Sequence, residues 1–297
     1  MNPKVTVIGG AGFIGSHLVE LLLAEGYQVT VIDNLSSGKK SNLKNLKIDL
    51  RVYDITDDPQ MIASMIKGSE CVFHLAALTS VQGSLERPTT YNLVNVIGTA
   101  NVLEACRLAD VKRFVFSSTS AVYGNTESFP TKETVTPEPM STYALTKLIG
   151  EQYCKMYSEL YGIHTTCLRY FNVYGDRPNL TSSYRSVIPI FLENSKAGKP
   201  LPFTNDGGQS RDFVHVTDVA NANLAAIGQK RYHDIINIGS GKSVTVNELM
   251  EVIGGECKSI GSRLEPRMSL ANIARAEAAL NWKPSINLLD WIKDQTL

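Results

Sequence analysis

Val5-Thr6-Val7-Ile8-Gly9-Gly10-Ala11-Gly12-Phe13-Ile14-Gly15 decides the fold of this 297-residue chain. Four β-branched residues at its start predict a buried strand, and the residues from Ser16 onward predict a helix. The glycines between the two permit a tight turn and a close approach of the backbone to a pyrophosphate, which would lie at the positive end of the helix. The stretch therefore predicts a dinucleotide-binding turn inside a βαβ unit.

Asp33 supports this prediction, because it follows Gly15 by 18 residues and ends the second predicted strand. A carboxylate there can accept hydrogen bonds from the adenosine ribose hydroxyls and would repel a 2′-phosphate. NAD is therefore expected rather than NADP, with Lys39 and Lys40 in the next loop as the argument for NADP. The alternative for Asp33 is a turn residue at a strand end.

Short β-rich runs alternate with helical stretches through the first part of the chain. A helix is expected over residues 92–109, where apolar residues recur near a 3.6-residue period, and strands are expected at Val5 to Ile8, Val29 to Asp33, Cys71 to Leu75 and Arg113 to Ser117. Apolar strands that alternate with helices predict an α/β fold with a Rossmann-type, doubly wound parallel sheet.

This rhythm breaks after about Arg169, where residues 172–211 are rich in Gly, Pro, Asn and Ser. We expect the chain to return to the sheet with strands at Asp212 to Val216 and Ile235 to Ile238. The expected division is an NAD-binding Rossmann domain, residues 1–170 with 211–238 returning to it, and a smaller C-terminal substrate-binding lobe, residues 171–210 and 239–297.

The composition excludes several classes of partner. Lys and Arg together number 29, as do Asp and Glu, so no basic surplus points to nucleic acid or to a polybasic anchor. No apolar run approaches the roughly 18 residues of a membrane span. The five cysteines form no Cys-x-x-Cys pair, and His74 and His215 lack partners at ligand spacing, so we expect reduced thiols, no metal and a cytoplasmic protein.

Tyr143 and Lys147 are four residues apart and would project from the same face of a helix. A phenol has a pKa near 10, and a neighbouring cation favours the phenolate, so the pair predicts a base that acts on an alcohol. Upstream, the hydroxyl residues from Ser117 to Ser120 end a strand at the edge where such sheets bind ligands. One of these hydroxyls could bridge the substrate oxygen and Tyr143; the alternatives are turn chemistry and chance spacing.

Together these features resemble the extended short-chain dehydrogenase/reductase family, and within it the UDP-hexose 4-epimerases. The resemblance covers nearly the whole chain, with matching segments at Gly9 to Gly15, Asp54-Ile55, His74 to Ala77, Asn95 to Thr99, Ser117 to Gly124, Tyr143 to Lys147, Arg169 to Gly175 and Arg211 to Asp218.

The resemblance implies a role for each matching position. Tyr143 would be the acid/base, Lys147 would bind the nicotinamide ribose and lower the pKa of the phenol, and Thr119 would complete the catalytic set. The implied NAD-binding residues are Gly9, Gly12, Phe13, Ile14, Gly15, Asp33, Asn34, Asp54, Ile55, Leu75, Ala76, Ala77, Asn95, Ser117, Tyr143, Lys147 and Tyr170. The implied substrate-binding residues are Thr79, Ser118, Thr119, Tyr143, Asn172, Val187, Phe203, Arg211, Arg263 and Ser269.

Ser120-Ala121 narrows the implied reaction, because sugar-nucleotide 4,6-dehydratases similar to this chain carry an Asp-Glu pair there. Without acid/base carboxylates, the loss of water from C5–C6 is not expected. The resemblance then implies that Tyr143 takes the proton of the 4-hydroxyl while NAD takes the C4 hydride, and that the hydride returns to the other face of a 4-keto sugar. The alternatives are a 4-keto reductase or dehydrogenase on the same scaffold and a non-catalytic NAD-binding protein.

The chain departs from the family pattern near its C-terminus, between Arg263 and Asn272. Either Arg263 or Arg267 would meet the diphosphate, and the spacing favours Arg263. Ser269 occupies the position of a bulky tyrosine in relatives restricted to unsubstituted hexoses, so a 2-acetamido group would fit there. This favours UDP-GlcNAc/UDP-GalNAc and leaves UDP-Glc/UDP-Gal open; the alternative for Ser269 is a helix cap.

A homodimer is also implied, since the family pairs through helices that correspond to residues 92–109 and 143–160. Apolar residues on the second helix could form part of an intersubunit bundle, namely Leu145, Leu148, Ile149 and Met156.

Overall fold

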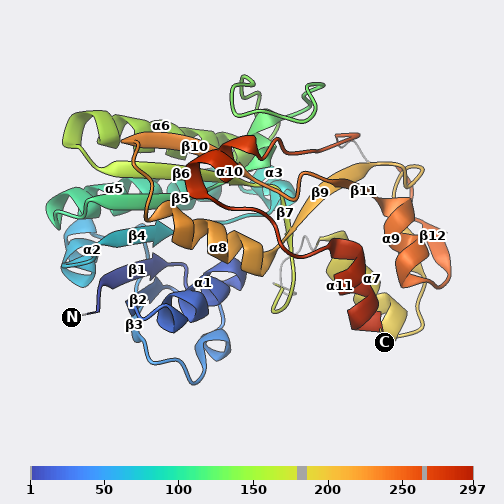
Figure 1. Cartoon of the computed structure of the whole chain (residues 1–297), viewed down its shortest axis with the longest axis horizontal. Coiled ribbons are helices and arrows are strands. Elements are labelled where there is room, and N and C mark those ends of the chain that lie inside the picture. Colours follow the sequence, from blue (N-terminus) through green and yellow to red (C-terminus); the bar gives the residue numbers. More distant parts are fainter. Residues whose placement is uncertain (1, 179–185, 263–265, 297) are drawn as a thin grey trace.

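The structure is a computed structural model that describes residues 2–178, 186–262 and 266–296 (Figure 1). Its largest element is a seven-stranded sheet with the order β10-β6-β5-β4-β1-β2-β3, in which every neighbouring pair is parallel. The strands are β1 (Lys4–Ile8), β2 (Gln28–Asp33), β3 (Asp49–Val52), β4 (Cys71–His74), β5 (Arg113–Thr119), β6 (His164–Tyr170) and β10 (His233–Ile238). This arrangement confirms the predicted Rossmann-type α/β fold.

The strand order reverses between β1 and β4, which places a crevice at the carboxyl ends of these two strands. Ile8, the last residue of β1, is paired with Ile32 on one side and His74 on the other. In doubly wound sheets, ligands bind outside the carboxyl ends of the strands at such a switch point. The topology therefore directs the residues after β1, β2, β4 and β5 to one edge.

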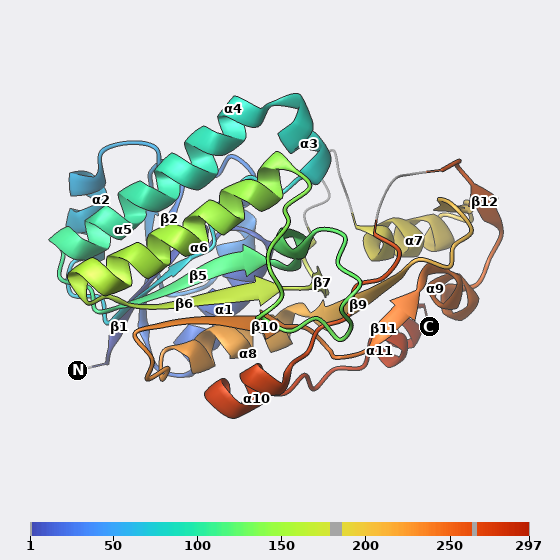
Figure 2. The ribbon, with the colours of Figure 1, turned by 90° about the horizontal axis from the view of Figure 1, so that it is seen from above.

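Helices cover both faces of the sheet, as Figure 2 shows for α5 and α6 on one face and α8 and α10 on the other. One hydrophobic cluster contains residues from α1 (Phe13–Ala24), α8 (Val216–Ala226) and α10 (Ala274–Leu280), and the other contains residues from α2 (Pro59–Ile66), α5 (Gly98–Leu108) and α6 (Thr142–Tyr161). None of the described helices is long and apolar enough to cross a membrane.

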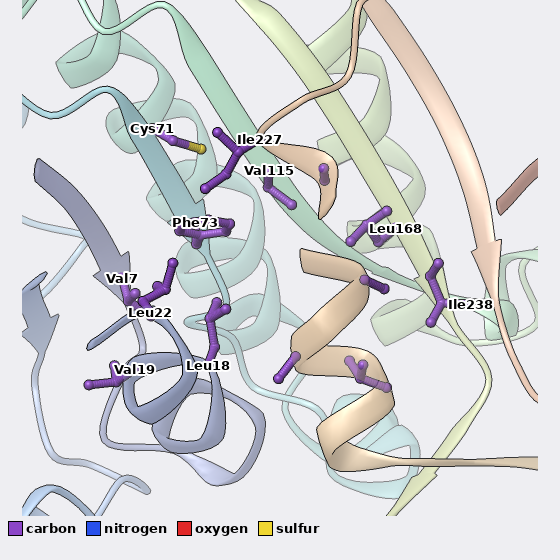
Figure 3. Packing of buried hydrophobic residues seen from close by; sticks show 14 of the residues in the cluster. Val7, Leu18, Val19, Leu22, Cys71, Phe73, Val115, Leu168, Ile227 and Ile238 are labelled. Atoms are coloured by element: carbon purple, nitrogen blue, oxygen red, sulfur yellow. The ribbon is translucent and has the colours of Figure 1, made fainter. Parts of the chain in front are cut away.

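Successive side chains of a strand point to opposite faces of the sheet, and this alternation explains the two clusters. Val7 packs on the α1 face and Ile8 on the opposite face, and Val115 and Phe116 of β5 divide in the same way. Figure 3 shows Leu18 and Leu22 of α1 against the sheet. A parallel sheet covered on both faces needs such continuous apolar strands, which is why β1, β4 and β5 were predicted correctly.

A smaller lobe follows the first six strands of the sheet. It contains a three-stranded sheet, β11-β9-β7, and a two-stranded sheet, β12-β8. A third hydrophobic cluster joins strands of both sheets to three helices. The elements of the lobe are β7 (Asn172–Tyr174), α7 (Val187–Lys196), β8 (Leu201–Phe203), β9 (Ser210–His215), β11 (Ser243–Thr245), α9 (Val246–Ile253), β12 (Cys257–Ser259) and α11 (Leu288–Thr296).

The strand expected to return to the large sheet at Asp212 to Val216 does not do so, and this prediction was wrong. The residues form β9, which pairs in parallel with β7 and antiparallel with β11. The sheet position beside β6 is taken by β10, so the return at Ile235 to Ile238 is confirmed. The division of the chain at the expected domain boundaries stays a prediction.

Asp212 of β9 holds the small lobe together from a fully buried position. Its carboxylate accepts hydrogen bonds from the Ser240 backbone N–H at 2.6 Å, the Ser240 hydroxyl at 2.8 Å, and the Gly241 and Ala271 backbone N–H groups at 3.0 Å each. Four donors from two separate segments therefore meet at one carboxylate.

We predict that Asp212→Ala lowers the free energy of unfolding by about 3 kcal/mol, because it leaves several buried donors without an acceptor. Urea unfolding followed by circular dichroism measures the effect. The matched control is Asp290→Ala, whose exposed carboxylate forms a surface ion pair with Lys293, and it should change stability by less than about 0.5 kcal/mol. Equal stabilities for the two variants would contradict the proposed role of Asp212.

Candidate functional site

The turn between β1 and α1 is one that only glycine can form. Gly9 has a positive φ of 84°, and a Cβ atom on it would lie 2.5 Å from the Ala76 backbone nitrogen. A Cβ atom on Gly15 would lie 2.2 Å from the Gly9 carbonyl oxygen. Because both contacts are with backbone atoms, neither position can relax by a side-chain movement. The helix therefore begins at Phe13 with its N-terminus facing the crevice.

A cavity of about 420 Å³ occupies this crevice. Its size lies within the range of small-molecule and cofactor sites. It brings together most of the predicted cofactor residues and all three predicted catalytic residues, namely Gly9, Gly12, Phe13, Ile14, Gly15, Asp33, Asn34, Ile55, Leu75, Ala76, Ala77, Ser117, Thr119, Tyr143, Lys147 and Tyr170. Two further residues of the lining, Thr79 and Ser118, were predicted to bind substrate. The glycine cradle, the helix N-terminus and this lining fit a dinucleotide.

Asp33 shapes the glycine turn as well as lining the cavity. Its Oδ2 accepts a hydrogen bond from the Ala11 backbone N–H at 2.9 Å, and its Oδ1 accepts one from the Leu35 N–H at 2.8 Å. Burial raises the pKa of this carboxyl group, and the two backbone donors oppose that rise. Nearby, the Asn34 amide donates to Asp54 at 2.7 Å, which places Asp54 beside the cavity but outside its lining.

Tyr143 lies in the first turn of α6, which Ser141 caps by accepting a hydrogen bond from the Ala144 N–H at 3.1 Å. Burial raises the pKa of Tyr143 to about 12, and a hydrogen bond with the Thr119 side chain opposes the rise. Thr119 also accepts a hydrogen bond from the Ala121 N–H at 3.2 Å, which fixes the orientation of its hydroxyl group. The phenol and this hydroxyl are therefore partners.

Lys147 follows one turn later on the same helix and is almost completely buried. Its ammonium group donates to the Ser117 carbonyl oxygen at 2.8 Å and lies 4.9 Å from the centre of the Phe116 ring. Burial lowers the pKa of Lys147 to about 8. In the chain alone, Lys147 is not among the groups that shift the pKa of Tyr143, so the expected lowering of that pKa stays a prediction.

Asn95 acts on the cavity through the loop that follows β4. Its side-chain oxygen accepts from the Leu78 N–H at 2.8 Å, while its amide donates to the Leu78 carbonyl at 2.9 Å and to the Thr146 hydroxyl at 3.1 Å. Asn95 lies in a π-helix, Asn92–Ile97, that precedes α5 within the predicted helix over 92–109. Such π-helical turns are frequent at functional sites.

Tyr170, at the end of β6, lines the cavity with its hydroxyl group satisfied. The hydroxyl lies 3.1 Å from the Ser117 hydroxyl and donates to the Asn223 side-chain oxygen at 2.9 Å. Phe171 and Val173 also line the cavity and were missed by the sequence analysis. Both are apolar and lie close to Tyr170 in the sequence, and this proximity could have indicated that they line the cavity.

Ser269 and Asn172, which were both predicted to bind substrate, are in hydrogen-bond contact. The Asn172 amide donates to the Ser269 hydroxyl at 3.3 Å and to the Asp212 carbonyl at 3.1 Å. The alternative role of Ser269 as a helix cap is wrong, because α10 begins at Ala274 and Ile273 is its N-cap.

The other predicted substrate residues lie in the small lobe, outside the cavity lining. Val187 begins α7 and Phe203 ends β8, and both pack against the third hydrophobic cluster. Arg211 donates to the Ser210 carbonyl at 2.9 Å. Arg267 forms an exposed bidentate ion pair with Asp206, with distances of 2.6 and 3.0 Å, whereas Arg263 lies outside the described residues.

The two histidines considered as metal ligands have other partners. His74 Nε2 lies 3.0 Å from the Thr99 hydroxyl, and His215 Nδ1 lies 2.8 Å from the Thr217 hydroxyl. Over residues 2–178, 186–262 and 266–296, no three His, Cys, Asp or Glu side chains gather in a way that could hold a metal ion.

Comparison with known proteins identifies the family. Residues 5–239 match the model of the NAD dependent epimerase/dehydratase family. Two similar structures are each 37% identical to the chain, and each covers 99% of this chain and 97% of its own. The first is a UDP-N-acetylglucosamine 4-epimerase from Methanobrevibacter ruminantium in complex with UDP-N-acetylmuramic acid, with a TM-score of 0.93. The second is a UDP-glucose 4-epimerase from Thermotoga maritima with UDP-glucose, with a TM-score of 0.92.

A third similar structure has a different sugar. It is a UDP-glucuronic acid 4-epimerase from Bacillus cereus in complex with UDP-glucuronic acid and NAD, which is 30% identical, covers 99% of this chain and 98% of its own, and has a TM-score of 0.89. The predicted NAD cofactor and the resemblance are thereby confirmed. With its glycine turn and its Tyr143–Lys147 helix in one cavity, the chain belongs to the NAD-dependent epimerase/dehydratase family, as an enzyme of its UDP-sugar 4-epimerase group.

Proposed function

We propose that this enzyme interconverts the C4 epimers of UDP-hexoses, with UDP-GlcNAc and UDP-GalNAc as its preferred pair. The observation that carries the proposal is the meeting of Thr119, Tyr143 and Lys147 with the glycine turn in one cavity. NAD, when bound, supplies the hydride acceptor and donor for C4. The residues of the chain hold the cofactor, orient the sugar and move the hydroxyl proton.

Tyr143 is the proton acceptor in this proposal. With a pKa of about 12 in the chain alone, its phenol keeps its proton at neutral pH. A positive charge near the phenol favours the phenolate, and the Lys147 ammonium and a bound oxidised nicotinamide would each supply one. Tyr143 would then give up its proton more readily in the enzyme that holds oxidised NAD.

Ser120 and Ala121 support epimerisation over dehydration. They begin a short 3-10 helix, Ser120–Tyr123, directly after Thr119. Neither residue has a carboxyl group, so these positions cannot supply the acid and base that elimination of water requires. A 4-keto sugar formed in the cavity would then be reduced again rather than dehydrated.

Epimerisation is tested by incubating the purified enzyme with UDP-GlcNAc or UDP-Glc without added cofactor and resolving the C4 epimers. We expect both epimers from the wild type, and for Tyr143→Phe a fall in kcat of about 10³-fold with NAD still bound, because the acid/base group alone is removed. Turnover that requires added NADH or NADPH would instead favour the 4-keto reductase. Full activity of Tyr143→Phe would favour a different base.

We propose that Ser269 provides the space for the 2-acetamido group. Its side chain is small, and its hydroxyl is held by Asn172, which belongs to the same implied sugar-diphosphate site. We assign Arg211 to the diphosphate from the resemblance and Arg263 from the spacing, while Arg267 forms an exposed ion pair with Asp206. These arginine roles, and the cytoplasmic location expected from the sequence, stay predictions.

For Ser269→Tyr we expect kcat/KM for UDP-GlcNAc to fall by about 100-fold relative to UDP-Glc, because the phenol fills the space of the acetamido group. Initial rates with the two substrates measure this ratio. Ser269→Ala is the matched control and should leave the ratio within about twofold of the wild-type value. An equal loss for both substrates in Ser269→Tyr would contradict the steric role.

We propose a homodimer that forms through the outer faces of the π-helix, α5 and α6. Figure 2 shows α5 and α6 side by side on the outer side of the sheet. Large apolar side chains remain exposed along these helices, namely Leu93, Ile97, Leu108, Leu145, Met156 and Leu160. Exposed apolar side chains on neighbouring helices favour association, and two helices from each subunit would form a four-helix bundle.

Sedimentation velocity at micromolar concentration tests the dimer. We expect a dimer for the wild type and a monomer for Ile97→Asp, since a carboxylate would be buried in the contact without a partner. The control is Ile260→Asp, which changes a more exposed isoleucine in the small lobe and should remain dimeric. A monomeric wild type would refute the proposal.

A further inference from the structure

A buried ion pair lies behind the catalytic residues and has no role in the function described so far. Glu151 of α6 and Arg169 of β6 are 1% and 2% exposed. The guanidinium donates to both carboxylate oxygens, from Nε at 2.8 Å and from Nη2 at 2.6 Å. A charged pair buried to this extent is costly unless its geometry is excellent, and removing either partner leaves an uncompensated charge.

The carboxylate of this pair reaches the end of β5. The Ser118 hydroxyl donates to Glu151 Oε1 at 2.5 Å. Ser118 precedes Thr119, whose side chain is the hydrogen-bond partner of Tyr143. Glu151 therefore fixes the strand end that carries Thr119 against the helix that carries Tyr143.

Glu151 is also one helical turn from Lys147 on α6. Tyr143, Lys147 and Glu151 follow one another at intervals of four residues, which places them along one face of α6. Lys147 in turn donates to the carbonyl group of Ser117, the residue before Ser118. Glu151 and Lys147 are thus both bonded to the same segment at the end of β5.

The surroundings of Lys147 contain few charges that could compensate its ammonium group. In the described part of the chain, three groups interact electrostatically with Lys147, namely Glu151 and Cys154 on α6 and His74 on β4. From β5, Lys147 meets the Phe116 ring and the Ser117 carbonyl. Glu151 supplies the only carboxylate of this described set.

Two neighbours on α6 act against the effect of burial on the pKa of Lys147, first Cys154 and then Glu151. Burial itself lowers this pKa. Lys147 in turn acts on His74, where burial first and the ammonium second lower the pKa of the imidazole to about 3. His74 is therefore neutral and leaves the ammonium without a competing cation on β4.

We propose that Glu151 is a positioning residue, which holds the Ser118–Thr119 strand end against α6 and keeps Lys147 charged inside the cavity. Its kinetic consequence rests on the proposed 4-epimerase function, whereas the charge of Lys147 does not. The alternative is that Glu151 and Arg169 only tie α6 to β6. A purely structural pair would change stability but would not change the protonation of Lys147.

The titration of Lys147 separates these two possibilities. In protein labelled with [ε-¹³C]lysine, the Lys147 resonance is assigned by its absence in Lys147→Met, and its shift is followed against pH in the free enzyme. For Glu151→Gln we expect the midpoint to fall by about one unit, because the opposing charge is gone. The high-pH limb of kcat should move by the same amount, with KM for the UDP-sugar changed less than about twofold.

Two control variants identify the origin of the shift. Ser118→Ala removes the strand contact and keeps both charges, so it should lower kcat several-fold without moving the Lys147 midpoint. Cys154→Ala removes the thiol and keeps the carboxylate, and it should move the midpoint less than Glu151→Gln does. A larger shift in Cys154→Ala would assign the effect to the thiol and overturn the role of Glu151.

A second variant keeps the test decisive if Glu151→Gln fails to fold around its unpaired arginine. Glu151→Gln combined with Arg169→Met removes both buried charges and should still show the lowered midpoint. A wild-type midpoint and a wild-type pH profile in this double variant would overturn the proposal. If the wild type epimerises no UDP-sugar, the proposed function fails, and the Lys147 titration still decides the charge role of Glu151.

Discussion

The contact between Gly15 and the Gly9 carbonyl group is the constraint on which the rest of the structure depends. A Cβ atom at position 15 would lie 2.2 Å from that oxygen, so α1 can follow β1 this closely only with glycine there. The tight turn aims the N-terminus of α1 at the crevice, and Gly9 approaches the backbone of Ala76 after β4 just as closely. The two sides of the switch point are thereby fixed to each other, and the cavity between them has a defined shape.

The second constraint is the packing of α6 across the ends of β5 and β6. Lys147 is bonded to the Ser117 carbonyl, and Glu151 is bonded to Ser118 and Arg169. These contacts set the position of the helix along the strands, and the position of the helix sets the distance from Tyr143 to Thr119. The residues proposed for catalysis are therefore held by buried main-chain and ionic contacts.

The parts of the fold that were predicted correctly are those with a local physical cause. The first βαβ unit follows from apolar strands and a glycine turn, both of which are visible in a short stretch of sequence. The error at β9 has the opposite cause, because an apolar strand pattern does not state which sheet accepts the strand. Pairing with Asn172–Tyr174 and the four hydrogen bonds to Asp212 depend on segments far apart in the chain.

The candidate site also has some features that could be predicted from the sequence and others that could not. The spacing of Tyr143 and Lys147 predicted a shared helix face, but not the desolvation that raises the pKa of the phenol to about 12. Glu151 was missed because its burial depends on Arg169 of another element, although its spacing from Lys147 was visible in the sequence. Helical spacing indicates which side chains are neighbours, whereas burial decides how they ionise.

Burial shifts the pKa values of Tyr143 and Lys147 in opposite directions. It makes the Tyr143 phenol a weaker acid and the Lys147 ammonium a stronger one, so both groups are drawn towards their neutral forms. If Lys147 were neutral, it would carry no positive charge to favour the phenolate form of Tyr143. We propose that Glu151, two helical turns beyond Tyr143 and paired with Arg169, is the anion that keeps the ammonium charged.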